Sequence, residues 1–352
     1  MKSTYKRLGD YIRPVDVRNR DEKVSRLLGV SIDKKFIESI ANTIGTDMSV
    51  YKIVRYGQFA YGPVTSRNGD KVSIALLTES ECIISSSYTV FEVVDKKVLL
   101  PEYLMLWFMR PEFDRYARFH SHGSAREIFA WEEMCNVELP VPPIDEQQKI
   151  VDAYQTIEHR IALKKKINEN LEKQISILYI NQKGDNTFII SDRCRIFTGR
   201  KDVNQAVSVG RYKFFSCSPF YLYSDEYIYD GKAVLVAGNG SYTGRTIFVD
   251  EKFDLYQRTY GIVPKNEKDD IIYLIYAAMS TEFVNKIKES LHGSAIPYIV
   301  YNDIAHFVIY HDDNTKATCN KISILLNARI KNNAEINLLT DFQSTLLCKM
   351  SD

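Results

Sequence analysis

Residues 144–182 read IDEQQKIVDAYQTIEHRIALKKKINENLEKQISILYINQ and contain neither glycine nor proline. Apolar side chains recur through this stretch mostly at steps of three and four residues, at Ile150, Tyr154, Ile157, Ile161, Ile167, Leu171, Ile175 and Leu178. This spacing predicts one long amphipathic helix. At about 1.5 Å per residue the helix would be roughly 57 Å long, more than one compact domain requires, so we expect it to connect two parts of the molecule.

The prolines immediately before this stretch define where the helix begins. Pro140, Pro142 and Pro143 end the preceding element, and Asp145 with Gln148 has the spacing of a capping box, which predicts a helix start near Asp145. In the middle of the helix, Lys164–Lys166 and Asn168 interrupt the apolar pattern. These polar residues either set the register of a helix pair or face solvent.

The sequence also contains an internal duplication with an offset of 170 residues. His122-Gly123-Ser124-Ala125 recurs as His292-Gly293-Ser294-Ala295, and the same offset relates 111–113 to 281–283 and Tyr103-Leu104 to Tyr273-Leu274. Several segments that agree on one offset predict two copies of a domain-sized unit. Two similar domains favour recognition of an extended, roughly two-fold ligand such as duplex DNA.

The second copy also ends in a helical pattern. After Asp312-Asp313-Asn314, apolar residues follow at Ile322, Leu325, Leu326, Ile330, Ile336, Leu339, Phe342, Leu346 and Leu347. Two long helices with narrow apolar stripes would most simply pack on each other as an antiparallel coiled coil. The alternative is that each helix folds back on its own domain.

Each copy has strand-like runs before its helices. These runs are β-branched or aromatic, separated by glycine turns, and lie at 59–61, 83–84, 88–94, 233–236, 246–249 and 260–263. A helix is expected after them, over 102–118 and 270–290. The predicted fold is therefore mixed α/β: two similar domains separated by two long helices packed as an antiparallel coiled coil, with pseudo-two-fold symmetry. The expected boundaries are 1–143, 144–182, 183–315 and 316–352.

The composition is that of an ordinary globular protein, with 45% hydrophobic and 26% charged residues and a net charge of +1. The longest apolar runs are too short to span a bilayer, so we expect a cytoplasmic protein. Its six cysteines form no Cys-x-x-Cys pair, which argues against structural zinc and a disulfide framework. Six basic residues could form a phosphate-facing surface or a solvated loop: Arg193, Arg195, Arg200, Lys201, Arg211 and Lys213.

The junction into the first helix carries a resemblance to a known family. It reads Leu139-Pro140-Val141-Pro142-Pro143-Ile144-Asp145-Glu146-Gln147-Gln148-Lys149-Ile150 and follows a Gly-Ser turn, in a chain that repeats this layout. The whole resembles the specificity subunit of type I restriction-modification systems. The second junction, Val308-Ile309-Tyr310-His311-Asp312-Asp313, departs from the motif because it lacks the prolines and the Glu-Gln pair.

The resemblance implies a non-catalytic DNA reader. Each domain would be a target recognition domain that contacts one half of a split target in double-stranded DNA, while the paired helices set the gap and dock methyltransferase subunits, two in number. Motor-nuclease restriction subunits would complete the complex. No cofactor is expected in this chain; S-adenosylmethionine, ATP and Mg would be on the partner subunits. A related type II or other phage-defence methylation system would give a similar specificity subunit.

Catalytic alternatives find little support in the sequence. The string from Gly238 to Thr246 lacks the glycine spacing and the lysine of a phosphate-binding loop. Asp16 followed by Asp21-Glu22-Lys23 is similar to a nuclease acid-acid-lysine cluster, but the four intervening residues leave no room for the strand pair that would bring these groups around a metal. No Asn-Pro-Pro-aromatic motif of adenine methyltransferases is present. A self-contained nuclease or transferase with a duplicated fold is the remaining alternative from another class.

The candidate functional residues are therefore DNA contacts. Arg and Lys suit guanine and phosphate, and Asn suits adenine, when they stand on loops with small residues nearby. We expect DNA contacts from Arg67, Asn68, Lys71 and Arg126 in the first copy and from Lys201, Asn239, Tyr242, Arg245 and Arg258 in the second. The recurring Gly-Ser step is expected to have a shared backbone role, because two domains that read different sequences should share scaffold and differ in readout.

Overall fold

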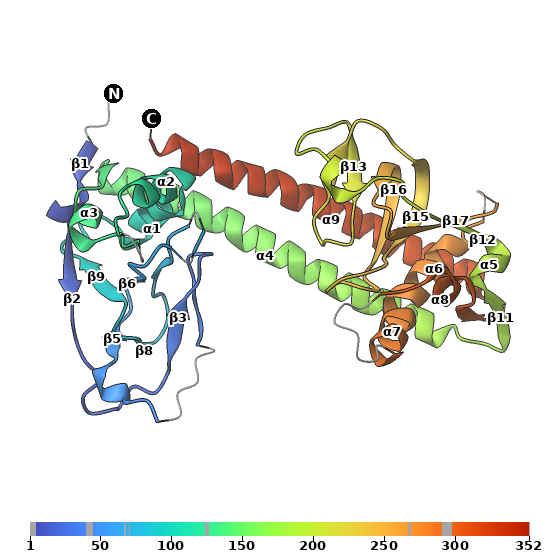
Figure 1. The fold of residues 1–352 in the computed structure, drawn as a ribbon, viewed down its shortest axis with the longest axis horizontal. Coiled ribbons are helices and arrows are strands. Elements are labelled where there is room, and N and C mark those ends of the chain that lie inside the picture. Colours follow the sequence, from blue (N-terminus) through green and yellow to red (C-terminus); the bar gives the residue numbers. More distant parts are fainter. Residues whose placement is uncertain are drawn as a thin grey trace. The chain divides into compact units, whose positions relative to one another are not determined.

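A computed structural model describes residues 5–39, 45–66, 68–69, 71–123, 127–266, 269–290 and 298–351 (Figure 1). The chain divides into two compact units: unit 1 is Met1–Ala162 with Asn337–Asp352, and unit 2 is Leu163–Ile336. Both long helices, α4 (Ile144–Asn181) and α9 (Thr315–Lys349), contribute a segment to each unit. No helix in the described ranges is long and apolar enough to cross a membrane.

Unit 1 is built on a four-stranded antiparallel sheet. Its order is β2 (Ile12–Val15), β9 (Thr89–Val93), β6 (Gln58–Tyr61) and β7 (Ile74–Leu76). Three two-stranded ladders accompany it: β1 (Tyr5–Arg7) with β10 (Glu138–Pro140), β3 (Leu28–Val30) with β4 (Phe36–Glu38), and β5 (Lys52–Val54) with β8 (Cys82–Ile84).

Unit 2 repeats this topology and extends it. Its six-stranded sheet has the order β12 (Cys194–Thr198), β17 (Thr259–Pro264), β15 (Tyr229–Ala237), β16 (Thr246–Leu255), β13 (Tyr212–Phe215) and β14 (Leu222–Ser224). The first four strands are antiparallel and match β2-β9-β6-β7 one by one. Likewise β11 (Asn186–Ile189) pairs with β18 (Val308–His311) as β1 pairs with β10. The duplication predicted from the repeated tetrapeptide is therefore confirmed in the strand order.

The helices after the sheets also correspond. Unit 1 has α1 (Pro101–Met109), α2 (Pro111–Phe119) and α3 (Trp131–Cys135); unit 2 has α6 (Ile271–Ala278), a π-helical turn (Met279–Phe283), α7 (Val284–Ser290) and α8 (Tyr301–Ala305). The short helix α5 (Ile190–Arg193) instead precedes the sheet of unit 2, between β11 and β12. The single helix expected over 102–118 was wrong. Pro111 disfavours a helical residue before it, and Arg110 is extended, with φ −71° and ψ 138°, so the chain forms two helices.

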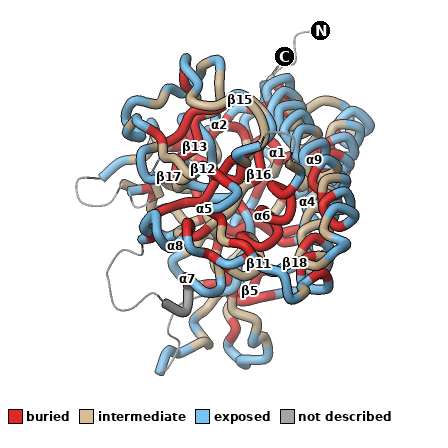
Figure 2. Tube along the Cα trace, turned by 90° about the vertical axis from the view of Figure 1, so that its right-hand side faces the viewer, coloured by how far each residue is buried: buried red, intermediate tan, exposed pale blue. Residues whose placement is uncertain are grey.

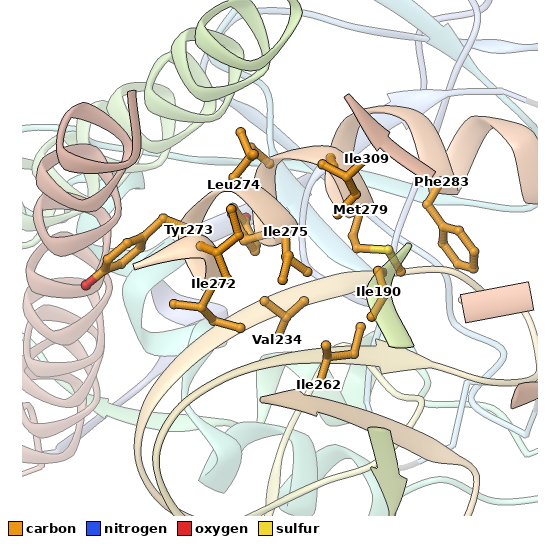
Figure 3. Close-up of a cluster of buried hydrophobic side chains, with 14 of the residues drawn as sticks. Ile190, Val234, Ile262, Ile272, Tyr273, Leu274, Ile275, Met279, Phe283 and Ile309 are labelled. Atoms are coloured by element: carbon orange, nitrogen blue, oxygen red, sulfur yellow. The ribbon is translucent and has the colours of Figure 1, made fainter. Parts of the chain in front are cut away.

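The core of each unit lies between its sheet and its helices. In unit 2, Ile272 and Ile275 of α6 point toward Val234 on β15 (Figure 3). Figure 2 shows α6 and the central strands buried along most of their length, whereas α4 and α9 alternate between buried and exposed positions. In unit 1, Phe59 and Phe91 stack with ring centroids 4.8 Å apart. Full burial of such a side chain contributes about 1.5–3 kcal/mol, so these layers dominate the stability of each unit.

Both long helices enter both cores. The buried cluster of unit 1 includes Val151 and Tyr154 from α4, Leu347 from α9, and Met350 directly after α9. That of unit 2 includes Ile175 and Tyr179 from α4 and Ile322 and Leu326 from α9. The alternative in which each helix packs only on its own copy is therefore wrong.

Polar contacts between α4 and α9 fix their register in unit 2. Lys164 Nζ lies 2.6 Å from Glu335 Oε2, Asn168 Nδ2 donates to Asn333 Oδ1 at 2.8 Å, and Glu172 pairs with Arg329. Residue numbers rise along α4 while they fall along α9, so the predicted antiparallel pairing is confirmed (Figure 1).

The same contacts correct one detail of the predicted stripe. Lys164 and Asn168 occupy the seam between the helices, which is the register-setting alternative, whereas Ile167 is 46% exposed and faces away from it. The apolar pattern placed Ile167 on the seam because a run of polar seam residues cannot be recognised from hydropathy.

The start of α4 is held by Gln147, which is fully buried. Its Oε1 accepts from Leu100 N at 2.9 Å, and its Nε2 donates to Val98 O and Pro142 O, each at 2.8 Å. The predicted capping box was wrong, because Gln148 Nε2 donates forward to Asp152 Oδ1 at 2.7 Å. The glutamine of the proline-rich junction therefore joins the helix start to the backbone that precedes α1.

Replacement of Gln147 by alanine should destabilise unit 1 by about 2–4 kcal/mol, since a fully buried side chain is removed and three part-buried backbone hydrogen bonds are lost. Gln148→Ala is the matched control and should change the free energy of unfolding by less than about 0.5 kcal/mol, because only a surface contact is lost. Urea unfolding followed by Trp fluorescence measures both. Equal effects of the two variants would refute this role of Gln147.

Charge reversal tests the register contact at the seam. Lys164→Glu and Glu335→Lys should each lower stability by about 1–2 kcal/mol by placing like charges together in a half-buried seam, and the double reversal should recover most of the loss. The double-mutant cycle is measured by thermal unfolding. Lys165→Glu makes the same charge change on the exposed face and should have little effect. Additive losses in the double variant would show that the two side chains do not interact.

Candidate nucleic-acid interface

The two sheets present equivalent loops between matching pairs of strands. We call these the central loops: residues 62–73 between β6 and β7 in unit 1, and residues 238–245 between β15 and β16 in unit 2. Each begins with a glycine in a tight position. A Cβ at Gly62 would lie 2.7 Å from Ser73 Oγ, and one at Gly238 would lie 2.3 Å from the carbonyl oxygen of Arg258. Only glycine lets the chain turn here without a shift of its neighbours.

The segment after the recurring tetrapeptide crosses the central loop in both units. Phe129 N donates to Pro63 O at 2.8 Å in unit 1, and Ile299 N donates to Gly238 O at 2.8 Å in unit 2. Gly123 has a φ of +136°, a conformation that favours glycine. Ser124 and Ala125, like the second copy at 292–295, lie outside the described residues. The shared crossing supports a common backbone role for this repeated segment.

The first-copy candidates differ in whether their side chains already make contacts within unit 1. Arg67 and Arg126 lie outside the described residues. Asn68 helps close the central loop, because its Nδ2 donates to Val64 O at 3.2 Å. Lys71 is 52% exposed, and its Nζ lies 3.7 Å from Asp33 Oδ1, a loose surface contact. Lys71 is therefore the described side chain of this set best able to reach a ligand.

The second-copy candidates Asn239, Tyr242 and Arg245 all stand on the central loop of unit 2. Asn239 forms a β-bridge with Tyr298, and Tyr242 is 49% exposed. Arg245 is half-buried, and burial lowers the pKa of its guanidinium. The exposed Arg258 is on the turn between β16 and β17, and its carbonyl oxygen accepts from Gly238 N at 3.0 Å. Fold topology thus gathers these four residues around one loop.

Lys201 has a different environment. Its Nζ lies 2.8 Å from Asp254 Oδ2 and 3.0 Å from Glu226 Oε2, and it donates to Ser224 Oγ at 2.9 Å. Burial alone would lower the pKa of Lys201, but hydrogen bonds to Asp254 and Glu226 outweigh it and raise the pKa. Lys213, from the same basic segment, pairs with Glu251 at 2.8 Å. These lysines neutralise acids within the unit, which limits the charge they could offer to phosphate.

A groove beside the central loop of unit 1 was missed by the sequence reasoning. It has a volume of about 840 Å³, and its lining includes Lys71, Arg115, Arg118 and Phe119. Phe119 is 81% exposed at the end of α2. The spacing of Arg115, Arg118 and Phe119 on one helix face is the signal that could have indicated this basic, aromatic edge.

The floor of this groove is held by a buried ion pair. Lys34 Nζ lies 2.6 Å from Asp114 Oδ1, which also accepts from Val72 N at 3.0 Å. Burial lowers the pKa of Lys34, while the Asp114 carboxylate opposes that shift. The pair therefore anchors the end of the central loop to α2.

The acidic residues considered for nuclease chemistry have local partners. Asp16 pairs with Arg18 at 2.7 Å, and the hydrogen bond from Arg18 lowers the pKa of that carboxyl. Asp21 pairs with Lys23 at 2.7 Å. Across the described ranges, no group of three or more His, Cys, Asp or Glu residues is placed to hold a metal ion. All six cysteines are free thiols, and burial raises the pKa of Cys194 to about 12.

Gly238→Ala should destabilise unit 2 by more than about 2 kcal/mol, because the new methyl group meets a backbone carbonyl that cannot rotate away. Proteolytic cleavage within 238–245 should become faster. Thermal unfolding and limited proteolysis measure these effects. Ser241→Ala, at an exposed position of the same loop, is the control and should stay within about 0.5 kcal/mol of the parent. A Gly238 variant as stable as the control would contradict the close approach.

Comparison with known proteins gives relatives of one kind. The specificity subunit of the type I restriction enzyme EcoDI from Escherichia coli is 37% identical over 123 residues, 34% of this chain and 25% of that protein. The specificity subunit of type I restriction enzyme HindI from Haemophilus influenzae is 23% identical over 154 residues, 43% of this chain and 33% of that protein. The matched segments thus span a quarter to a third of the relatives' length.

The fold is shared with a solved structure over nearly the whole chain. The S subunit of a type I restriction-modification system from M. genitalium superposes with a TM-score of 0.63 at 12% identity, covering 99% of this chain and 95% of that one. The family model for the type I restriction modification DNA specificity domain matches residues 22–173 and again 183–310. With most of its length matched by two copies of this domain, the chain belongs to the type I restriction-modification DNA specificity family.

Proposed function

We propose that this chain is the non-catalytic, sequence-specific DNA-binding subunit of a type I restriction-modification complex, and that each unit reads one half of a bipartite target. The observation that carries the proposal is the contrast between scaffold and loop. The strand order β2-β9-β6-β7 equals β12-β17-β15-β16, yet the central loops at 62–73 and 238–245 differ in length and in side chains. A shared scaffold with different loops suits two half-sites of different sequence.

The proposed contacts follow from the position of the candidates. Lys71 in unit 1 and Tyr242 and Arg258 in unit 2 are exposed on or beside the central loops, so they can reach base edges or phosphates. Asn68 and Asn239 shape the loops and could offer their remaining amide groups. Arg67 and Arg126 remain proposals from the sequence. Lys201 is the weakest member of the set because its ammonium already serves Asp254 and Glu226.

The long helices would set the spacing of the half-sites and bind partner subunits. On the helix pair of unit 2, Ile177 and Ile324 are exposed beside Leu178 and Leu325, and these residues line an apolar hollow of about 410 Å³. Exposed apolar surface of this kind favours a protein partner. We assign it to a methyltransferase subunit, two of which would bind along the helices. Motor-nuclease subunits would join them in the cytoplasm, and S-adenosylmethionine, ATP and Mg would be held by these partners.

A domain exchange tests the proposal. Residues 188–315 are replaced by the equivalent segment of a homologue, the chain is expressed with its methyltransferase, and the host methylome is sequenced. One half of the methylated target should change while the other half and the expression level stay the same. Changes in both halves would refute the assignment of one unit to one half-site.

The purified chain supplies the second readout. Alone it should neither methylate nor cleave DNA, and activity should require added methyltransferase. Modification by the chain alone would favour the self-contained enzyme. A specificity subunit of a related type II or other phage-defence methylation system would give the same exchange result but work without motor-nuclease subunits.

A further inference from the structure

A cavity of about 390 Å³ in unit 2 lies between the central loop, α6 and the two long helices. Its lining includes Tyr242, Thr243, Arg245, Tyr276, Ser280 and Arg329. Arg329 of α9 and Glu172 of α4 are both part of the wall. The cavity therefore lies between the central loop and the helix pair, within unit 2.

At the cavity wall, the positive charge of Arg329 is offset by the carboxylate of Glu172. Arg329 forms an ion pair with Glu172 and donates from Nη1 to the hydroxyl of Tyr276 at 2.6 Å, while that hydroxyl donates to Glu172 Oε1 at 2.8 Å. Burial raises the pKa of Tyr276, so its hydroxyl is neutral at any physiological pH. The three side chains form a closed network in which Glu172 offsets Arg329.

The charge of Arg245 is not balanced. Its Nη2 donates to the carbonyl oxygen of Ser218, while its buried Nε has no hydrogen-bond partner among the described residues. No carboxylate in the described part of the chain forms an ion pair with it. A desolvated guanidinium without a counter-charge is costly, and an anion in the cavity would offset that cost. Glu172 also lines the cavity, but its carboxylate already forms an ion pair with Arg329.

The chemistry of the wall favours a phosphate group as this anion. Arg245 offers a planar fork of N–H donors, which matches the oxygens of a phosphate, and Tyr242 adds a hydroxyl at the exposed edge of the same loop. The loop lies beside Arg258, and Asn239 is on it, both of them proposed DNA contacts. A phosphate next to base-reading side chains would fix the register of the loop on the duplex.

We propose that the cavity around Arg245 binds one phosphate group of the DNA backbone, an inference that rests on the proposed function. The site is specific to unit 2. In the matched strand register, Gly62 N donates to Ser73 O as Ala237 N donates to Arg245 O, so Arg245 corresponds to Ser73 of unit 1, a buried residue without a charge. Unit 2 therefore contacts a DNA phosphate through a site that unit 1 lacks. Residues of α4 and α9 form part of the wall of this site.

The salt dependence of DNA binding tests this assignment in the full chain. Affinity for a short fluorescent duplex is measured by anisotropy over a range of KCl concentrations. Each phosphate contact contributes about 0.9 to the slope of log affinity against log salt, so Arg245→Gln should reduce that slope by about 0.9. Arg245→Lys retains the charge and should retain the slope. Lys252→Gln removes a charge from an exposed position of β16 and, as the control, should leave the slope unchanged.

Inorganic phosphate distinguishes the source of the anion. At constant ionic strength, phosphate in place of chloride should raise the Tm of the parent chain but not that of Arg245→Gln. Phosphate stabilisation with an unchanged DNA slope would overturn the DNA assignment and point to an anion from another source, such as an acidic side chain of a partner protein. A Gln variant that matches Lys252→Gln in both measurements would eliminate the site. Absence of DNA binding by the parent chain would instead reject the proposed function, and this inference with it.

Discussion

The antiparallel packing of α4 against α9 is the constraint on which the rest of the structure depends. Each unit takes a segment from both helices into its core, so neither core is complete without residues that are distant in the chain. Apolar packing alone allows neighbouring registers in such a pair. In unit 2 the contact of Lys164 with Glu335 and that of Asn168 with Asn333 are satisfied in one register only, because a slip of one turn would separate both pairs.

The two units share their scaffold but differ in the central loops and in the pockets beside them. The four matching strands, the glycine at the start of each central loop and the crossing near Phe129 or Ile299 are common to both units. The groove beside Phe119 belongs to unit 1, and the cavity at Arg245 belongs to unit 2. Under the proposed function, this division between a constant frame and variable loops would allow one fold to recognise many DNA sequences.

The sequence predicted the features that repeat or follow a period, and it missed those that depend on a single contact. Helix α4, the antiparallel pair and the two similar domains came from periodicity and from the offset of 170 residues. The break at Arg110 was missed because the apolar pattern continues through Pro111. The role of Gln147 was missed because a buried glutamine and an exposed one look alike in sequence. Among the candidate contacts, only three-dimensional proximity showed that Lys201 pairs with neighbouring acids, whereas Arg245 forms no ion pair with an acid in the described ranges.

The discontinuity of unit 1 has a consequence for biosynthesis. Leu347 and Met350 complete its buried cluster, and Ser351 accepts a hydrogen bond from Tyr5 and another from Arg110. Ribosomes add roughly 5–20 residues per second, so the nascent first unit waits on the order of ten seconds or more for these side chains. During that interval the face of α4 that packs against α9 has no intramolecular cover. Protection by a chaperone, or early association with a partner protein, would therefore matter most while the second half of the polypeptide is still being translated.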